Sequence, residues 1–365
     1  MKFSFVIPVV SLGVLAVGCA GAGGTDLRSP VSSGSPGSNS NMNPAVVPLH
    51  AVLSTEAIVG EVGDSAIWSN TADPTRSEIL VTDMSEKSGG LVVFDTAGKQ
   101  TQKIDLKEPC AVDVLQGATV GGKPADLAVV VERGTRTLKI FTIDPASGKL
   151  TDVTAESESA PAINAAKLDV QVSLVERKGE LGVFVTPAST KEGGDFAQFK
   201  LVEADGKFTA KLVRVAGGGT EKSQPAGIAV DPDKGTIYFA DEKTAIKRAS
   251  SDPEAKAVDA PFAKTGYTGS RGAMEVVKIG TTTYLFSLEK LPGGSKIHAF
   301  KLGGKEPKSE ATIMTSIPEA SGFDATTKAF GKEYPEGALV IVAGNTKSVQ
   351  LFDLREVIRA IQAAR

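Results

Sequence analysis

Short apolar segments separated by Gly, Asp, Asn and Pro turns make up most of the chain from about residue 50 onward. Some of these segments alternate apolar and polar residues, and others, such as Leu127–Val131 and Ala338–Val342, are apolar throughout. Alternation indicates strands with one buried face, whereas unbroken apolar runs indicate strands buried on both faces. Only the last segment, Leu354–Arg365, has the spacing of an amphipathic helix. The pattern therefore predicts an all-β protein of many short antiparallel strands.

The same order of strands recurs six times. Each unit has a first strand, a more apolar second strand, and then one or two alternating strands joined by a Gly- or Asp-containing turn. The first strands begin near Asp64, Asp113, Asp169, Gly227, Glu275 and Asp324. Asp64 and Asp113 are 49 residues apart, as are Glu275 and Asp324, and four-stranded repeats of about 40 to 50 residues are typical of β-propellers.

The sixth unit is one strand short at its C-terminal end. We expect Ala51–Val59 to supply this outer strand, because the pairing would close the ring and cover two exposed sheet edges. A β-sandwich, the alternative for an all-β chain, does not predict sixfold order. We therefore expect a six-bladed β-propeller with four antiparallel strands per blade, formed by residues 49–365 as a single, monomeric domain.

The first 48 residues have a different character. In residues 1–19, Lys2 precedes an apolar run that is too short to span a bilayer and ends at Cys19; small residues before that cysteine indicate a lipoprotein signal peptide. Ala16 replaces the commoner Leu, so an ordinary cleaved signal with an incidental Cys19 is the alternative. Residues 20–48 are rich in Gly, Ser, Pro and Asn, which predicts a flexible linker. We expect an exported protein, lipid-anchored in the cell envelope (outer membrane or cell surface) or secreted.

The composition excludes several kinds of site. The two cysteines, Cys19 and Cys110, offer no disulfide framework, and Cys110 is expected to be a small buried residue. Of the two histidines, His50 borders the linker and His298 is expected at the surface of a strand. Any metal should therefore have oxygen ligands. The formal net charge of −3 excludes a strongly basic nucleic-acid-binding protein.

Charged residues gather in the loops that a propeller places around one mouth of its central channel. The loops between second and third strands carry a basic residue in every unit: Lys87, Arg133, Arg136, Lys191, Lys243, Lys290 and Lys347. The strand entries and one adjoining loop carry carboxylates: Asp64, Asp113, Asp241, Glu242, Glu275 and Asp324. Carboxylates can hold a hard cation such as calcium, while Lys and Arg can bind phosphate oxygens. Each residue taken alone could equally be solvated surface.

Several stretches resemble the β-propeller phytases over roughly residues 55 to 357. They include Gly63-Asp-Ser-Ala-Ile-Trp68, Asp73-Pro74, Gly89-Gly-Leu-Val-Val-Phe-Asp95, Lys191-Glu-Gly193, Ile237-Tyr-Phe-Ala-Asp-Glu242, Gly322-Phe-Asp324 and Tyr334-Pro-Glu-Gly337. The resemblance implies a six-bladed enzyme that binds calcium and hydrolyses inositol phosphates such as phytate with metal-activated water. It implies phosphate-binding roles for Lys87, Arg133 and Lys191, and metal-binding roles for the six carboxylates.

The chain departs from the family pattern at Val170, where the family has Tyr, and at three carboxylate positions. Gly63, Ala226 and Ala273 stand where the family has carboxylates, and such losses should weaken calcium binding and raise the pKa of a bound water. Two hypotheses therefore stay open. One is a calcium-dependent phosphomonoesterase acting on inositol phosphates. The other is a non-catalytic envelope propeller that binds an anionic ligand or a partner protein.

Overall fold

Among the residues that the structure describes, twenty-five β-strands and one C-terminal α-helix account for most of the chain that follows the linker. A computed structural model describes residues 48–155, 163, 170–187, 194–218, 225–255, 260–304 and 307–365. Cys19 and Lys191, two of the residues singled out in the sequence, lie outside the described residues. Within the described part of the chain, no helix is long and apolar enough to cross a membrane.

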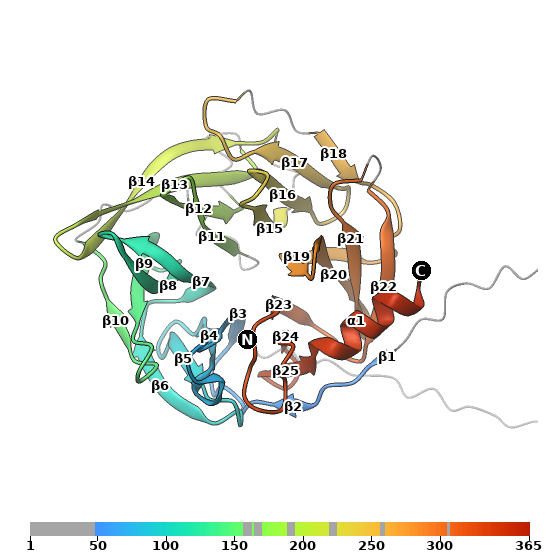
Figure 1. Cartoon of the computed structure of the whole chain (residues 1–365), viewed down its shortest axis with the longest axis horizontal. Helices are drawn as coiled ribbons and strands as arrows, with labels where there is room; N and C mark the ends of the chain where they lie inside the picture. The colour runs from blue at the N-terminus through green and yellow to red at the C-terminus, as the bar shows by residue number, and fades with distance from the viewer. Residues whose placement is uncertain are drawn as a thin grey trace, which may run out of the picture. The chain divides into compact units, whose positions relative to one another are not determined.

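Six antiparallel sheets surround a central channel, each a blade whose first strand lies innermost (Figure 1). Blades 1 and 2 consist of β3 (Val62–Trp68), β4 (Glu78–Asp83), β5 (Gly90–Phe94) and β6 (Gln100–Asp105), and of β7 (Pro109–Val120), β8 (Lys123–Glu132), β9 (Thr137–Ile143) and β10 (Leu150–Asp152). Blades 3 and 4 consist of β11 (Gln171–Arg177), β12 (Glu180–Thr186), β13 (Phe196–Ala204) and β14 (Lys207–Ala216), and of β15 (Pro225–Asp231), β16 (Thr236–Asp241), β17 (Ile246–Ser250) and β18 (Ala260–Ala263). Blades 5 and 6 contain β19 (Ser270–Ile279), β20 (Thr282–Leu291), β21 (Gly294–Lys301) and β22 (Ser309–Thr315), and then β23 (Ala320–Thr326), β24 (Ala338–Ala343) and β25 (Ser348–Asp353). The predicted six-bladed propeller is confirmed.

The N-terminal segment closes the ring. Strand β2 (Leu53–Ser54) pairs antiparallel with β25, with Leu53 opposite Leu351, and so supplies the missing outer strand of blade 6 as predicted. The sequence did not indicate a second pairing, in which β1 (Pro48–Leu49) runs parallel to β22 and becomes a fifth strand of blade 5. Both outer edges are therefore covered by residues from the other end of the chain, which removes edges that could pair with other molecules.

The second strand of each blade explains the unbroken apolar runs in the sequence. All side chains of Leu127–Val131 in β8 and of Ala338–Val342 in β24 are fully buried, because neighbouring blades cover both faces of each sheet. One such layer joins Trp68 and Leu80 of blade 1 to Val130 and Phe141 of blade 2. At about 25 cal/mol per Å² of buried apolar surface, these layers between blades stabilise the ring.

The C-terminal helix α1 (Leu354–Ala363) lies against the outside of the propeller beside β22 (Figure 1). It buries Leu354, Val357 and Ile361 in a cluster that also contains Phe286 of blade 5 and Phe323 of blade 6. The predicted C-terminal helix is therefore confirmed, and it packs on two blades.

The prediction for Cys110 is confirmed and the one for His298 is wrong. Cys110 is only 1% exposed. His298 is 2% exposed, and its Nε2 lies 2.7 Å from Oε2 of the fully buried Glu289. The alternation in the sequence around His298 was read as one solvated face, but the Tyr267 ring packs against the imidazole, with ring centroids 4.3 Å apart, and covers it.

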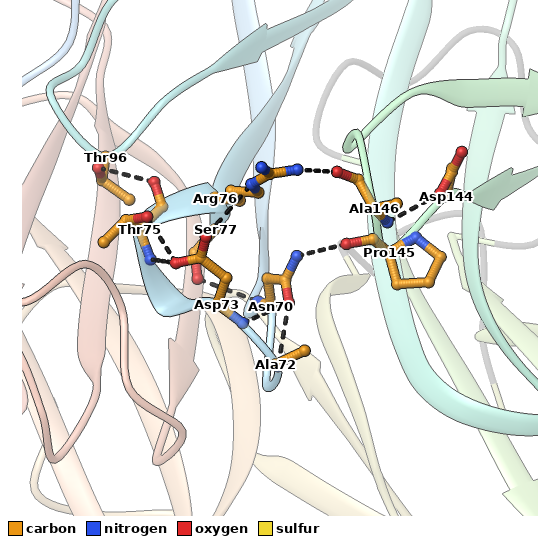
Figure 2. A network of polar contacts seen from close by, with 10 residues as sticks. All are labelled: Asn70, Ala72, Asp73, Thr75, Arg76, Ser77, Thr96, Asp144, Pro145 and Ala146. Carbon is orange, nitrogen blue, oxygen red and sulfur yellow. Dashed lines mark hydrogen bonds and ion pairs between the residues drawn. The ribbon is translucent and has the colours of Figure 1, made fainter.

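The Asp73-Pro74 pair has a structural role on the face opposite the loops between second and third strands. The Asp73 side chain accepts a hydrogen bond from the Thr75 N–H (3.1 Å) and caps the short 3₁₀-helix Pro74–Arg76. Two contacts join this loop of blade 1 to the β9–β10 loop of blade 2 (Figure 2): the Asn70 side-chain amide donates to the Pro145 carbonyl at 2.7 Å, and the Arg76 guanidinium donates to the Ala146 carbonyl. This motif therefore fastens two blades together and lies away from the charged loops.

Candidate functional site: the channel and its mouth

Five of the six innermost strands carry a β-bulge at the same place, where the strand enters the channel. The pairing with the second strand shifts register between Val62 and Ser65, Pro109 and Ala111, Pro225 and Gly227, Arg271 and Met274, and Ala320 and Phe323. Strand β11 is the exception, since its register with β12 is continuous. Bulges redirect side chains and are frequent beside active sites. Their repetition marks this end of the channel, which we call the mouth, as a shaped site.

The bulge residues themselves line a small pocket at the mouth. Residues from all six blades contribute: Gly63, Met84, Cys110, Val170, Gln171, Ala226, Lys290 and Ser321. None of these side chains is a carboxylate, and Lys290 is the one charged residue among them. Two of the three positions that lack a family carboxylate, Gly63 and Ala226, therefore lie in the pocket lining.

Close approach of the inner strands depends on small residues at the bulges. A Cβ on Gly322 would lie 2.6 Å from Oδ1 of Asp64 in the neighbouring blade, and a Cβ on Gly227 would lie 2.3 Å from the Gly272 carbonyl oxygen. Both distances are shorter than any tolerable contact, so only glycine fits. These glycines let blades 6 and 1, and blades 4 and 5, meet at the channel.

Four predicted carboxylates lie on the inner strands next to the mouth, and three of them join adjacent blades. Asp64 of β3 accepts from the Val112 N–H of β7 (3.3 Å), Asp113 of β7 accepts from the Leu174 N–H of β11 (2.6 Å), and Asp324 of β23 accepts from the Ile67 N–H of β3 (2.6 Å). The second oxygen of each accepts the N–H of the following residue, from Ser65, Val114 and Ala325 respectively. We call these three carboxylates and Glu275 the channel ring.

The channel ring is electrostatically strained. Burial raises the pKa of Asp64 well above its ordinary value, and the charges of Asp113 and Asp324 raise it further. Burial and the charge of Asp324 raise the pKa of Asp113 to about 7, and burial raises that of Asp324 to about 6. The pKa of Glu275 is raised by burial and then by Asp324, Asp113 and Asp64. The groups opposing these shifts are backbone N–H donors, so either a bound proton or a nearby positive charge would stabilise the ring.

A hard cation suits the donor chemistry of this ring, because calcium prefers several oxygen ligands. The arrangement is less favourable: among the described residues, no three acidic, His or Cys side chains are placed so as to hold one metal ion. Backbone donors already occupy both oxygens of three carboxylates, although a carboxylate oxygen can accept more than one partner. The negative charge of the channel ring thus favours a cation. Among the described residues, however, fewer than three of its carboxylates are placed to bind the same ion.

The other two predicted metal ligands lie apart from the ring. Oδ1 of Asp241 accepts from the Lys243 and Thr244 N–H groups (both 3.1 Å) and so shapes the β16–β17 loop. The Glu242 carbonyl accepts from the Arg271 N–H (3.0 Å) and links this loop to blade 5. The structure therefore brings together four of the six predicted metal ligands.

Of the predicted phosphate-binding residues, Lys87 and Arg133 are described. Lys87 is exposed in the β4–β5 loop. The Arg133 side chain is 12% exposed, and Nη2 lies 3.3 Å from Oε1 of Glu108. The positive charge of Arg133 acts on the Cys110 thiol, which lines the mouth. Arg133 is therefore close enough to influence a ligand in the mouth, though held by an acidic partner.

Sequence reasoning missed a buried polar cluster at the rim of blade 5. Glu289 accepts from the Gly269 N–H (2.5 Å), from the Thr268 N–H and from the Thr268 hydroxyl (2.9 Å), besides its contact with His298. Its pKa is lowered to about 2 because the bonds to His298, Gly269 and Thr268 outweigh burial. Arg271 lies over the Tyr267 ring at 4.3 Å. No local sequence pattern marks this cluster, since its members come from β19, β20, β21 and the loop before them.

Solved structures share the propeller architecture. An α-L-arabinanase from Penicillium chrysogenum in complex with arabinobiose superimposes with a TM-score of 0.51 at 15% identity, covering 86% of this chain and 99% of that chain. A GH93 α-L-arabinofuranosidase of Fusarium graminearum gives a TM-score of 0.52 at 11% identity, covering 85% and 98%. At such identities these similarities concern the fold alone.

Sequence comparison is more specific. The chain is 28% identical over 193 residues to a 3-phytase from Bacillus subtilis (strain 168), a stretch that covers 52% of this chain and 48% of that protein. The match therefore spans about half the length of this relative. The family model for Phytase matches residues 35–282, which is more than half of the chain and includes the mouth contributions of blades 1 to 4. The chain belongs to the Phytase family of β-propeller proteins.

Proposed function

We propose that the protein is a phytase-like phosphomonoesterase that hydrolyses inositol phosphates with the help of calcium. Membership of the Phytase family supports the hydrolase class. The observation that carries the proposal for calcium is the channel ring. Burial and mutual repulsion raise the pKa values of its four carboxylates, and no basic group is among the causes of these shifts. A bound cation would remove this repulsion.

Two groups of residues have different proposed roles, namely the carboxylates of the channel ring and the basic residues of the loops between second and third strands. A cation bound beside Asp64, Asp113, Glu275 and Asp324 would neutralise their charge and would supply a more acidic water. Arg133 and Lys87, on loops of the same face, would bind phosphate oxygens, and the planar guanidinium of Arg133 suits two oxygens at once. Lys191 is proposed for the same role from the resemblance of its loop to the family.

Phosphate release from phytate tests the proposal. The full chain should release inorganic phosphate in millimolar calcium and lose this activity in chelator. Glu275→Gln is the sharpest variant, because Glu275 is the ring member without a hydrogen bond to a neighbouring blade in the described residues. It should lower turnover and leave the fold intact, whereas Asp233→Asn, at a side chain that is 68% exposed, should have no effect. Absence of phosphate release in calcium would refute the enzymatic proposal.

A second function is favoured by the mouth itself. Gly63, Ala226 and Ala273 remove carboxylates at the bulges, which supports a non-catalytic propeller that binds an anionic ligand or a partner protein in the envelope. Binding of inositol phosphate without phosphate release, under the same conditions, would select this function.

We also propose that Cys19 carries a lipid anchor that holds the protein in the envelope, since the apolar run and small residues before Cys19 are followed by a polar linker. We propose that the anchored protein is a monomer. The non-acidic Ala20 favours the outer membrane of a double-membrane cell. Cys19→Ser should release the protein from membranes. Retention of this variant in the membrane fraction would contradict the anchor.

A further inference from the structure

A hollow of about 410 Å³ lies on the face of the propeller opposite the mouth. Its walls are the loops that link first to second strands in blades 1 and 6, the β9–β10 loop, and parts of β7, β8 and β9. These wall segments belong to the described part of the chain without a gap. The volume falls within the roughly 300–1,000 Å³ of small-molecule sites. We call this hollow the rear site, and its lining includes Thr71, Gln116, Pro124, Asp126, Pro145 and Lys328.

Hydrogen bonds between blades fix the walls of the rear site. The Asn70 side-chain amide of blade 1 donates to the Pro145 carbonyl of blade 2 at 2.7 Å (Figure 2). Asn70 Oδ1 also accepts from the N–H groups of the two residues after Thr71 (3.0 and 2.9 Å), which sets the course of that loop. The Gln116 side-chain amide of blade 2 donates to the Ser69 carbonyl of blade 1. The site is therefore preorganised, and a ligand would bind without first ordering its walls.

Two side chains of opposite charge line the rear site, Asp126 of β8 and Lys328 of the β23–β24 loop. Asp126 Oδ2 accepts from the Trp68 indole N–H and Oδ1 from the Gly117 N–H, both at 2.7 Å. These bonds hold the carboxylate in place and leave each oxygen able to accept a second donor. Lys328 Nζ donates to Gln116 Oε1 at 3.3 Å, and an ammonium group has three N–H donors. The rear site thus offers fixed acceptors and a cationic donor together.

This combination favours a ligand without net charge. An anion would be repelled by Asp126 and a cation by Lys328. A ring that carries several hydroxyl groups avoids this repulsion, since each hydroxyl can donate to a carboxylate oxygen and accept from an ammonium or amide N–H. Pro124 and Pro145 add apolar surface for the C–H groups of such a ring.

We propose that the rear site binds a neutral cyclic polyol, either a free inositol or a sugar residue of a glycan. The inference goes beyond the proposed function, because it concerns the opposite face of the propeller and requires neither calcium nor a phosphate group. The two sources share one chemistry, a ring of hydroxyl groups that bridge a carboxylate and an ammonium group.

Trp68 provides a local readout of this site. It is the one tryptophan of the chain, and its indole N–H donates to a carboxylate in the lining of the rear site. In a nitrogen–proton NMR spectrum of the full chain, its indole signal should shift and saturate during titration with myo-inositol, glucose, galactose or mannose at millimolar concentrations. Saturation by myo-inositol identifies a free polyol as a ligand, and saturation by a hexose identifies a sugar residue.

Lys328→Met removes the ammonium group and keeps most of the aliphatic stem. It should raise the concentration for half-saturation ten- to a hundredfold, the range expected for loss of one charge-assisted hydrogen bond. An unchanged indole signal without ligand shows that this variant is folded. Lys332→Met is the matched control, because Lys332 is exposed on the same loop and is not among the described lining residues. Its half-saturation should equal that of wild type.

Three results would overturn the inference. The first is an indole signal that none of the four polyols shifts at tens of millimolar. The second is equal half-saturation of wild type and Lys328→Met. The third is a shift that saturates with glycine and with none of the polyols, because a zwitterion could place its ammonium on Asp126 and its carboxylate on Lys328.

Discussion

Asp324 joins the last blade of the propeller to the first, and its replacement by alanine should destabilise the closed ring. Its two oxygens accept from the Ile67 N–H of blade 1 and from its own neighbour Ala325, both at 2.6 Å. Ala66 and Ile67, which share the donating peptide group, are only 1% and 4% exposed, so water cannot readily replace the lost acceptor. Asp324→Ala therefore leaves two N–H groups without their carboxylate.

The magnitude follows from these two bonds. A buried donor left unsatisfied costs about 1–3 kcal/mol, so two of them cost roughly 2–6 kcal/mol. Removing a charge that raises the pKa of Asp113 and Glu275 relieves part of the repulsion in the channel ring and offsets some of this loss. A net destabilisation of about 1–4 kcal/mol is expected, a sizeable part of the 5–15 kcal/mol typical of a folded protein.

Urea unfolding in chelator measures this effect without any contribution from bound metal. The midpoint should fall in the order wild type, Asp324→Asn, Asp324→Ala, because asparagine keeps one acceptor oxygen. The slope should stay constant if the same surface is exposed on unfolding. Asp233→Ala, at an exposed ion pair, should stay within about 0.5 kcal/mol of wild type. Equal midpoints for Asp324→Ala and Asp233→Ala would refute a role for this carboxylate in joining the blades.

Three further predictions concern calcium, the rim and an isolated buried carboxylate. Millimolar calcium should raise the melting midpoint relative to chelator, since a ligand at a hundredfold excess over its Kd adds about 2.7 kcal/mol; an unchanged midpoint would count against a cation in the channel ring. Arg133→Ala should weaken binding of an inositol phosphate by about ten- to a hundredfold at nearly unchanged stability, because the side chain contacts Glu108 on a rim loop; equal affinities in calorimetry would remove Arg133 from the site. Burial and then the charge of Asp95 raise the pKa of Glu78 to about 8, and its Oε2 lacks a hydrogen-bond partner. Because the folded state holds this proton more tightly than the unfolded state, wild type should lose stability as the pH rises from about 4.5 to 8. Glu78→Gln should remove this part of the pH dependence and be more stable than wild type above pH 8, by a few kcal/mol at most since one pKa unit is about 1.4 kcal/mol; parallel stability curves for the two proteins would contradict the shift.

The sequence was sufficient for the architecture because a propeller repeats one local pattern. Each second strand is covered on both faces, so runs such as Leu127–Val131 are apolar throughout and recognisable without any structure. The missing strand of the sixth unit likewise indicated closure by Leu53–Ser54. The resemblance to the family followed from short stretches of sequence. One of them, Asp73-Pro74, lies in a loop that links blade 1 to blade 2 (Figure 2).

The chemistry of the channel depended on tertiary structure. Side chains 49 or more residues apart converge there, and whether an acidic residue faces the mouth or a neighbouring blade is set by a one- or two-residue bulge that the sequence does not announce. Asp64 illustrates this: it was predicted as a metal ligand at a strand entry, yet within the bulge between Val62 and Ser65 its side chain accepts from the Val112 N–H of the next blade. His298 was wrongly expected at the surface, because local alternation cannot show that Tyr267, from the segment before β19, packs against its ring. Periodicity along the chain determines which strands form, whereas the direction of a side chain in a shared channel depends on how six blades pack.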